Sequence, residues 1–320
     1  MQLPSQARRA LLACALFAAA GLAQAQPNVT KIVVPFPPGG VTDQAARILA
    51  ESMGRSLGQT FIVDNRPGAG SRIGVEAVVK APADGGTLLF TNSSYSILPV
   101  VDPKVPFDPA KALAPISMTA TYGLQMVVRK DLPVGTLQEF IAYARAHPGQ
   151  LSYGSAGVGS GTHFAGEYFK ALTGTHLVHI PYKSTTGALA DVAGGLLDFA
   201  MDAAAKPLVD AGKVKLLAVT GDRRDPRFPD TPTAPEAGLK EFAAMQSWVG
   251  LLAPAGTPQA LVDRLNAAAA AAAADPAVQK RLADLGLVPR GGPAAKLEAA
   301  IRDELVLYRK IATQAKLRFD

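Results

Sequence analysis

Short apolar runs alternate along the chain with longer stretches whose apolar residues recur at helical spacing. The first apolar run covers residues 32–34, and Ala45, Ile48, Leu49 and Met53 then fall on one face of a helix. The run is typical of a buried strand, and the second pattern is typical of an amphipathic helix. Because strand-like and helix-like segments continue to alternate, the pattern predicts an α/β fold.

The same pattern predicts the remaining elements. Strands are expected at residues 61–63, 87–91, 124–129, 151–153, 178–181, 197–201, 214–220 and 248–253. Helices are expected at residues 71–80, 137–146, 163–172, 187–192, 257–274 and 276–285, and in a last segment with Leu297, Ile301, Leu305 and Tyr308 on its core side. Residues 99–115 carry five prolines and are predicted to be a semi-rigid connection rather than an element.

The N-terminal residues have the pattern of an export signal. Arg8 and Arg9 precede an apolar run at residues 10–22, and Ala-Gln-Ala at residues 23–25 has the small-x-small form of a cleavage site. We therefore predict a signal peptide over residues 1–25, cleaved near Ala25, and a periplasmic mature protein. The apolar run is too short for a permanent membrane span.

The length of the mature chain indicates two domains, because about 295 residues are more than one core usually serves. We place a first, discontinuous domain at residues 26–123 and 248–320, and a second at residues 124–247. The predicted strands at residues 124–129 and 248–253 would cross between them.

Charge and composition exclude several classes of function. Cys14, the only cysteine, lies in the predicted signal peptide, so the mature chain has no thiol for disulfides, nucleophilic catalysis or metal binding. Without Arg8 and Arg9 the net charge falls from +6 to +4, and no block of Lys and Arg is present. Nucleic acid is therefore not an expected partner, whereas a small anionic ligand is compatible with the charge. We expect no metal, because the histidines lack ligand spacing, and no cofactor.

The first candidate site is the loop after residues 32–34. Pro37 and Pro38 fix the backbone, Gly39 and Gly40 allow a ligand to approach it closely, and a helix then begins near Thr42. Unpaired N–H groups at a helix start attract anions, although an ordinary strand-to-helix turn fits the same residues. Asp43 also has two interpretations. It either stabilises the helix start and pairs with Arg47, or it contacts the ligand.

The second candidate site repeats this arrangement in the other half. A strand, a glycine-rich loop at residues 154–163 and a helix start follow one another. The loop lacks the glycine spacing and acidic partner of a dinucleotide site, the lysine of a phosphate-binding loop and the G-x-S-x-G of a hydrolase. His163 is the only histidine in a plausible site, which leaves an exported hydrolase or lyase with His163 as base as a rival function.

Polar residues also follow other predicted strands. Asn92 and Ser93 follow residues 87–91, Lys183 follows residues 178–181, and Asp202 follows residues 197–201. Ligands bind at the carboxyl ends of strands in open parallel sheets. We expect Asp202 to face a cleft, whereas Lys183 also fits a solvated side chain.

Several separated motifs resemble those of Bug-type solute receptors, the binding proteins of tripartite tricarboxylate transporters. They are Pro-Phe-Pro-Pro-Gly-Gly-x-x-Asp-x-x-Ala-Arg at residues 35–47, Asn-Arg-Pro-Gly-Ala-Gly at 65–70, Ala-Pro-Ala-Asp-Gly at 81–85, Pro-Tyr-Lys at 181–183, and Leu-Leu-Ala-Pro-Ala-Gly-Thr-Pro at 251–258. The chain departs from the family pattern at Gly86, Ser184 and Gly187. The last two lie near the expected cleft, so the specificity of relatives is not carried over.

The resemblance implies a fold of the periplasmic binding protein type II kind, with two α/β domains joined by two crossover strands and closing on a ligand. It also implies that backbone amides and small hydroxyls of two facing loops, at residues 37–43 and 155–163, bind a small carboxylate. The predicted ligand-binding residues are Pro37, Pro38, Gly39, Gly40, Thr42, Asp43, Asn92, Ser93, Ser155, Gly157, Ser160, Gly161, Thr162, His163, Lys183 and Asp202.

The function expected from these observations is capture of a small carboxylate, such as a di- or tricarboxylate, an acidic amino acid or an aromatic acid, without catalysis. The expected partners are the membrane subunits of a transporter, and the receptor itself is expected to be a monomer. A signalling receptor of the same fold, which presents its ligand-bound form to a sensor, would have the same sequence features.

Overall fold

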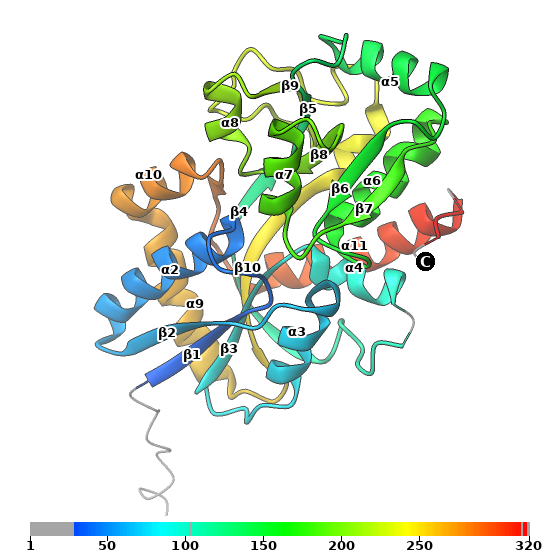
Figure 1. The fold of residues 1–320 in the computed structure, drawn as a ribbon. Helices are drawn as coiled ribbons and strands as arrows, with labels where there is room; N and C mark the ends of the chain where they lie inside the picture. Colours follow the sequence, from blue (N-terminus) through cyan, green and yellow to red (C-terminus); the bar gives the residue numbers. More distant parts are fainter. Residues whose placement is uncertain (1–28, 103, 315, 319–320) are drawn as a thin grey trace, which may run out of the picture.

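The computed structural model describes residues 29–102, 104–314 and 316–318, so the predicted signal peptide lies outside the described residues. The chain forms two α/β domains, each built on its own sheet (Figure 1). The lower domain in Figure 1 contains the first and last parts of the described chain, and the upper domain contains the middle part. The expected fold class is confirmed.

The lower domain has a six-stranded sheet in the order β11-β4-β10-β3-β1-β2. Its strands are β1 (Val29–Val34), β2 (Thr60–Asn65), β3 (Thr87–Asn92), β4 (Leu113–Gly123), β10 (Gln246–Pro254) and β11 (Val288–Pro289). β1 is parallel to β2 and β3, whereas β10 is antiparallel to β3 and β4. The carboxyl ends of β1 and β3 therefore meet at one edge, where the loop at residues 35–40 and Asn92 lie.

Helices cover both faces of this sheet. They are α2 (Val41–Leu57), the 3-10 turn η1 (Ala69–Ser71), α3 (Arg72–Val79), α4 (Ser94–Val101), α9 (Gln259–Ala274), α10 (Pro276–Asp284) and α11 (Ala294–Gln314). Ile32 and Val34 belong to the core under α2, while Val33 belongs to the core under α3 and α11. A strand buried on both faces needs consecutive apolar residues, which explains the uninterrupted run in the sequence.

The upper domain has a five-stranded sheet in the order β7-β6-β8-β5-β9. Its strands are β5 (Gln125–Arg129), β6 (Ser152–Ser155), β7 (Val178–Pro181), β8 (Phe199–Asp202) and β9 (Val214–Val219). Its helices are α5 (Leu137–Ala146), α6 (Gly161–Thr173), α7 (Thr185–Ala193), α8 (Lys206–Asp210) and η2 (Lys240–Met245). β6 is parallel to β7 and β8, so the ends of these three strands point to the lower domain together.

Two segments connect the domains, and one threonine bonds to both. β4 continues into β5 through Leu124 alone, and η2 continues directly into β10. The Thr220 hydroxyl accepts from the Leu124 N–H at 2.8 Å and donates to the Met245 carbonyl at 2.6 Å. A Cβ at Gly123 would lie 2.2 Å from the Thr220 carbonyl oxygen, so this close approach requires glycine.

The structure corrects the interpretation of residues 99–115. A helix, α4, occupies Ser94–Val101 despite Pro99, and β4 begins at Leu113. Pro99 has no N–H to donate within α4, so the helix loses one hydrogen bond there and ends at Val101. Pro115 is tolerated in β4 because β11 pairs only with Ala120 and Thr121, so β4 has no strand on that side at Pro115. β5 lies wholly in the upper sheet, and the crossing occurs at Leu124.

The alanine-rich segment is helical, as predicted. In α9, Ala268, Ala269, Ala272 and Ala273 are buried, and the helix packs against β4 and α2. Small side chains allow a helix to approach a sheet closely, so the tract contributes close contact rather than bulk.

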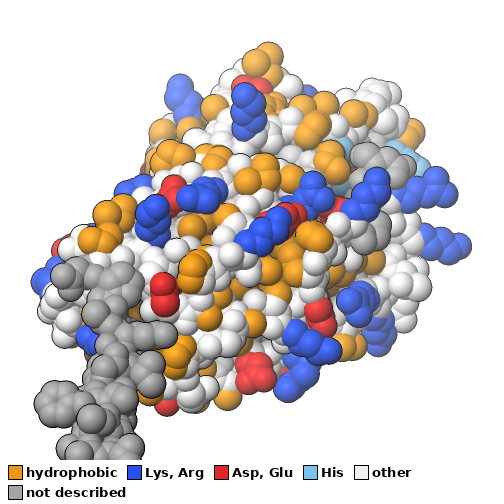
Figure 2. All heavy atoms as spheres, turned by 90° about the horizontal axis from the view of Figure 1, so that it is seen from below, with side chains coloured by type: hydrophobic (Ala, Val, Ile, Leu, Met, Phe, Trp, Pro, Cys, Tyr) orange, Lys and Arg blue, Asp and Glu red, His pale blue; other side chains and the backbone are white. Residues whose placement is uncertain are grey.

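The surface carries basic side chains without one dominant cluster. In the face shown in Figure 2, Lys and Arg side chains are spread among apolar and a few acidic ones. Among the helices of the described residues, none is long and apolar enough to cross a membrane.

Candidate functional site

A cavity of about 100 Å³ lies between the two domains, at the edges where the parallel strands end. Nine of the predicted ligand-binding residues line it: Pro37, Pro38, Gly40, Thr42, Asn92, Ser160, Gly161, Thr162 and Asp202. These residues come from distant parts of the chain, so the fold brings both predicted loops to one site.

The lower wall of the cavity is the start of α2. Gly40 is the N-cap residue and provides no side chain to cap the helix. The N–H groups of the first helical turn have no partners within a helix, and the positive end of the helix dipole points the same way. This wall is therefore suited to an anion. Asn92 supports it, because its side-chain amide donates to the Thr42 hydroxyl at 3.1 Å.

Asp43 does not line the cavity but holds the loop in front of it. Its carboxylate accepts from the Gly39 N–H and the Asn65 amide, each at 2.9 Å, and from Arg47 at 3.1 Å. Burial alone would raise the pKa of Asp43, but these hydrogen bonds hold the pKa below its ordinary value. The helix-start interpretation of Asp43 agrees with these contacts.

The start of α6 forms the facing wall, in the upper domain. Ser160 is its N-cap, and the Ser160 hydroxyl accepts from the His163 N–H at 3.2 Å. The Thr162 hydroxyl accepts from the Ala156 N–H at 2.9 Å. Both hydroxyls therefore shape the loop as well as facing the cavity, whereas Gly157 lies outside the lining.

His163 lies behind this loop and not on the cavity. It is only 2% exposed, its Nδ1 accepts from the Gly159 N–H at 3.2 Å, and its ring stacks on His179 at 4.1 Å between centroids. Burial, together with His179, lowers the pKa of His163 to about 4. Ser155 is also outside the lining, and its hydroxyl bonds to His179 at 2.6 Å.

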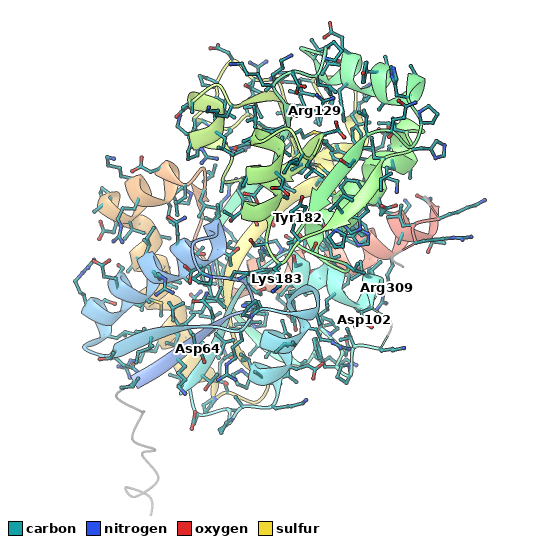
Figure 3. All side chains as sticks on the ribbon, viewed as in Figure 1. Asp64, Asp102, Arg129, Tyr182, Lys183 and Arg309 are labelled. Atoms are coloured by element: carbon teal, nitrogen blue, oxygen red, sulfur yellow. The ribbon has the colours of Figure 1, made fainter. Side chains whose placement is uncertain are left out.

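The start of α7 is a third helix terminus at the cavity, and the sequence analysis did not identify it. Ser184, Thr185 and Thr186 line the cavity, and no side chain caps α7. These residues follow β7 and precede a helix, so the strand, loop and helix order that marked the first two loops would have found them. Lys183 precedes them but is exposed outside the lining, on the loop that descends from β7 in Figure 3.

Asp202 is the one carboxylate among the described residues that line the cavity. Its carboxylate accepts from the Thr185 hydroxyl and, at 2.7 Å, from the Ala204 N–H. Burial raises the pKa of Asp202, and these hydrogen bonds only partly oppose the rise. No lysine, arginine or histidine is among the described lining residues, and Arg227, which lies outside the lining, lowers the pKa of Asp202 through its charge.

Further lining residues were also missed: Phe36, Val41, Ser94, Tyr122, Leu124, Ala156 and Ala203. Tyr122 comes from the end of β4, and Leu124 from the crossover that had been predicted to begin there as a strand. Ser94 starts α4, which was not predicted as a helix because its segment contains Pro99. Val41 and Ala156 lie inside the two predicted loops, at residues 37–43 and 155–163, whereas the others reach the cavity through tertiary packing.

Ser93 belongs to a smaller neighbouring cavity of about 60 Å³. The Ser93 hydroxyl donates to Glu304 of α11 at 3.0 Å, and the Trp248 indole donates to the same carboxylate at 2.8 Å. Burial raises the pKa of Glu304 to about 7. This network joins α11 to the start of α4 and to β10, beside the crossover.

The geometry suits binding of an anion. Three helix starts, of α2, α6 and α7, present backbone N–H groups and hydroxyls to one cavity. His163 is separated from the cavity by its own loop, and no cluster of three potential metal ligands occurs among the described residues.

Comparison with known proteins identifies relatives of this architecture. The family model described as "Tripartite tricarboxylate transporter family receptor" matches residues 45–317. The structure of the periplasmic binding protein BugD superposes with a TM-score of 0.85 and 33% sequence identity, covering 91% of this chain and 98% of that one.

Two ligand-bound structures from Rhodopseudomonas palustris are similar as well. Rpa4515 with adipate has a TM-score of 0.86 and 34% identity, covering 92% of this chain and 99% of that one. MatC with bound malate has a TM-score of 0.84 and 32% identity, covering 89% of this chain and 99% of that one.

Proposed function

Because the chain belongs to the family of tripartite tricarboxylate transporter receptors, we propose that it captures a small carboxylate between its two domains. The observation that carries this proposal is the convergence of three uncapped or hydroxyl-capped helix starts on one cavity without a cation. Backbone N–H groups can hold a carboxylate without leaving a buried, unpaired cation when the ligand departs. The adipate and malate bound by similar proteins support this class of ligand.

We further propose that the protein is exported to the periplasm and delivers its ligand to membrane subunits of a transporter. The pattern of residues 1–25 supports export, and the description of the family supports a transporter partner. The similarity to a periplasmic binding protein agrees with this location.

The protein is proposed to leave its ligand unchanged. His163, the base that the sequence suggested, is buried and accepts a hydrogen bond from its own loop. The ligand that the protein binds with the highest affinity should therefore be recovered intact after prolonged incubation. A product detected by mass spectrometry, and lost in His163→Ala, would favour a hydrolase or lyase.

The proposed site is tested at Gly40. A Cβ at Gly40 would meet only the Pro37 carbonyl, at 3.9 Å, so Gly40→Val should fold normally while its side chain blocks the N–H groups of α2. Thermal-shift screening of succinate, malate, adipate, citrate, aspartate and benzoate should identify a ligand. Calorimetry should then show that Gly40→Val weakens its binding by at least ~2 kcal/mol.

Gly135→Val is the matched control. A Cβ at Gly135 would meet only Glu139, at 3.5 Å, and Gly135 is not on the cavity. Equal affinity in the wild type and in Gly40→Val would show that the loop before α2 does not contact the ligand. If no carboxylate raised the unfolding temperature, the proposed function itself would be wrong.

A further inference from the structure

We propose that Asp202 selects carboxylates whose far end carries an ammonium group and disfavours those with a second carboxylate. This inference rests on the proposed function, because it assumes that the starts of α2 and α6 hold the first carboxylate. The ligands proposed for this chain are therefore amino acids whose ammonium group lies far from the first carboxylate.

The first step of the argument is the charge of the cavity. Asp202 and Tyr122 are the only ionisable side chains among the described lining residues. Burial raises the pKa of Tyr122 to about 12, so the phenol stays neutral. Burial raises the pKa of Asp202, whereas the Thr185 hydroxyl, the Ala204 N–H and the charge of Arg227 oppose this rise, and a bound ammonium group would favour the charged form further. A ligand with one carboxylate would therefore share a partly enclosed space with the Asp202 carboxyl group and with no side-chain cation of the lining.

The second step is that the cation whose charge acts on Asp202, Arg227, is already engaged elsewhere. Arg227 pairs with Asp225 at 2.7 Å and donates to the Ala203 carbonyl at 3.0 Å. Arg227 is not on the cavity, and its ion pair with Asp225 is buried. Its charge lowers the pKa of Asp202, but its N–H groups are engaged with Asp225 and Ala203 rather than with a ligand.

The third step concerns the start of α7, which could otherwise bind a second carboxylate. The Thr185 hydroxyl in its first turn donates to Asp202. Asp202 thus already complements the positive end of α7, and an additional carboxylate there would face a like charge at short range. An ammonium group at the same place would donate hydrogen bonds to Asp202 and balance its charge.

The position of Asp202 is set by the backbone. It ends β8, its neighbours in β8 pair with β5 and β6, and its second oxygen accepts from the Ala204 N–H. A carboxylate held on both sides cannot swing away from a bound ligand without losing these bonds. It is therefore a fixed determinant of specificity.

The experiment measures dissociation constants at pH 7.5 for ligands matched in length. Each set contains an amino acid, the carboxylate in which a methyl group replaces the ammonium, and the dicarboxylate. The sets are 3-aminopropanoate, butanoate and succinate; 4-aminobutanoate, pentanoate and glutarate; and 5-aminopentanoate, hexanoate and adipate. The pair 2-aminobutanoate and butanoate tests an ammonium next to the carboxylate. In the wild type, the best amino acid should bind at least tenfold tighter than its methyl and dicarboxylate counterparts.

Asp202→Asn should reverse this order. It keeps an oxygen that accepts from Thr185 or Ala204 but removes the charge, so binding of the best amino acid should weaken at least tenfold. Binding of the matched dicarboxylate should tighten severalfold. Asp210→Asn is the control, since it removes the charge of an exposed carboxylate that pairs with Lys206 and lies outside the cavity, and the order of the ligands should stay as in the wild type.

Three outcomes would overturn the inference. A dicarboxylate that binds tightest to the wild type would refute the role of Asp202 while leaving a carboxylate receptor in place. Equal weakening of all classes in Asp202→Asn would show a purely structural role. Failure of every ligand to bind would refute the proposed function and this inference together.

Discussion

At the residue scale, two polar side chains near the loops hold the loop backbone and do not line the cavity. Asp43 bonds to Gly39, and His163 bonds to Gly159, each four residues away in its own loop. The two domains thus use different side chains for the same task. A loop fixed before binding loses less conformational entropy when the ligand arrives.

The buried His163 predicts a dependence of stability on pH. Its pKa is lowered from 6.5 to about 4, so the unfolded chain takes up a proton first as the pH falls. Stability from neutral His163 is complete above pH 6.5 and is lost between 6.5 and about 4. Relative to His163→Phe, the free energy of unfolding of the wild type should fall by about 3 kcal/mol between pH 7 and pH 4.

Denaturant unfolding at several pH values measures this difference. The comparison with the variant is necessary because Glu304 acts in the opposite direction. Its pKa is raised from 4.5 to about 7, so its contribution falls as the pH rises through that range. A difference between the wild type and His163→Phe that does not change with pH would contradict the assignment.

At the element scale, the starts of α2, α6 and α7 line the cavity. The alanine-rich helix α9 packs closely against β4 and α2. Ala269 in α9 is fully buried, whereas Ala271 on the same helix is exposed. Both positions are helical and lie two residues apart, so they differ mainly in their surroundings.

This difference predicts the effect of a larger side chain. Ala269→Leu should lower the free energy of unfolding by about 1–3 kcal/mol, because the added carbons have no space between α9 and its neighbours. Ala271→Leu should change it by less than about 0.5 kcal/mol. Equal effects in chemical denaturation would mean that α9 packs more loosely than the structure shows.

At the scale of the whole molecule, the two domains touch across the cleft through backbone atoms. A Cβ at Gly70 in the lower domain would lie 2.9 Å from the carbonyl carbon and oxygen of Gly159 in the upper domain. Likewise, a Cβ at Gly161 would lie 2.9 Å from the Ser94 hydroxyl. The structure is therefore a closed arrangement in which glycines allow the domains to meet.

Because of this contact, a side chain at Gly70 should prevent the domains from closing, although Gly70 does not line the cavity. Gly70 has φ +64° and Gly58 has φ +62°, but nothing lies within 4 Å of a Cβ at Gly58. Asparagine tolerates this backbone region, so Gly70→Asn and Gly58→Asn carry similar strain. Only Gly70→Asn should hold the domains apart, and it should weaken ligand binding by about tenfold, because ligand binding and closure are coupled.

Small-angle scattering provides the second measurement. With saturating ligand the wild type should have a smaller radius of gyration than without ligand, and Gly70→Asn should show less of this change than Gly58→Asn. Identical scattering profiles with and without ligand in the wild type would refute closure by two domains. The domain division after residues 123 and 247 remains a prediction. Limited proteolysis of the full chain would test it, because cuts between the domains should fall near these two positions.

The sequence by itself determined the α/β class, most of the strands and helices, and two of the loops that line the cavity. It could do so because these features depend on local patterns, namely apolar runs, helical spacing and glycine-rich helix starts. Even the burial of residues 32–34 on both faces was visible as an uninterrupted apolar run.

Only the tertiary structure decided which of those residues face the cavity. Asp43 and His163 are directed into their own loops by hydrogen bonds with N–H groups that a sequence pattern does not reveal. The start of α7, and the residues at the β4 crossover, reach the site because separate strands end at one edge. The charge of the cavity is likewise set by the assembled walls, because the described residues that line it with Asp202 include no lysine, arginine or histidine.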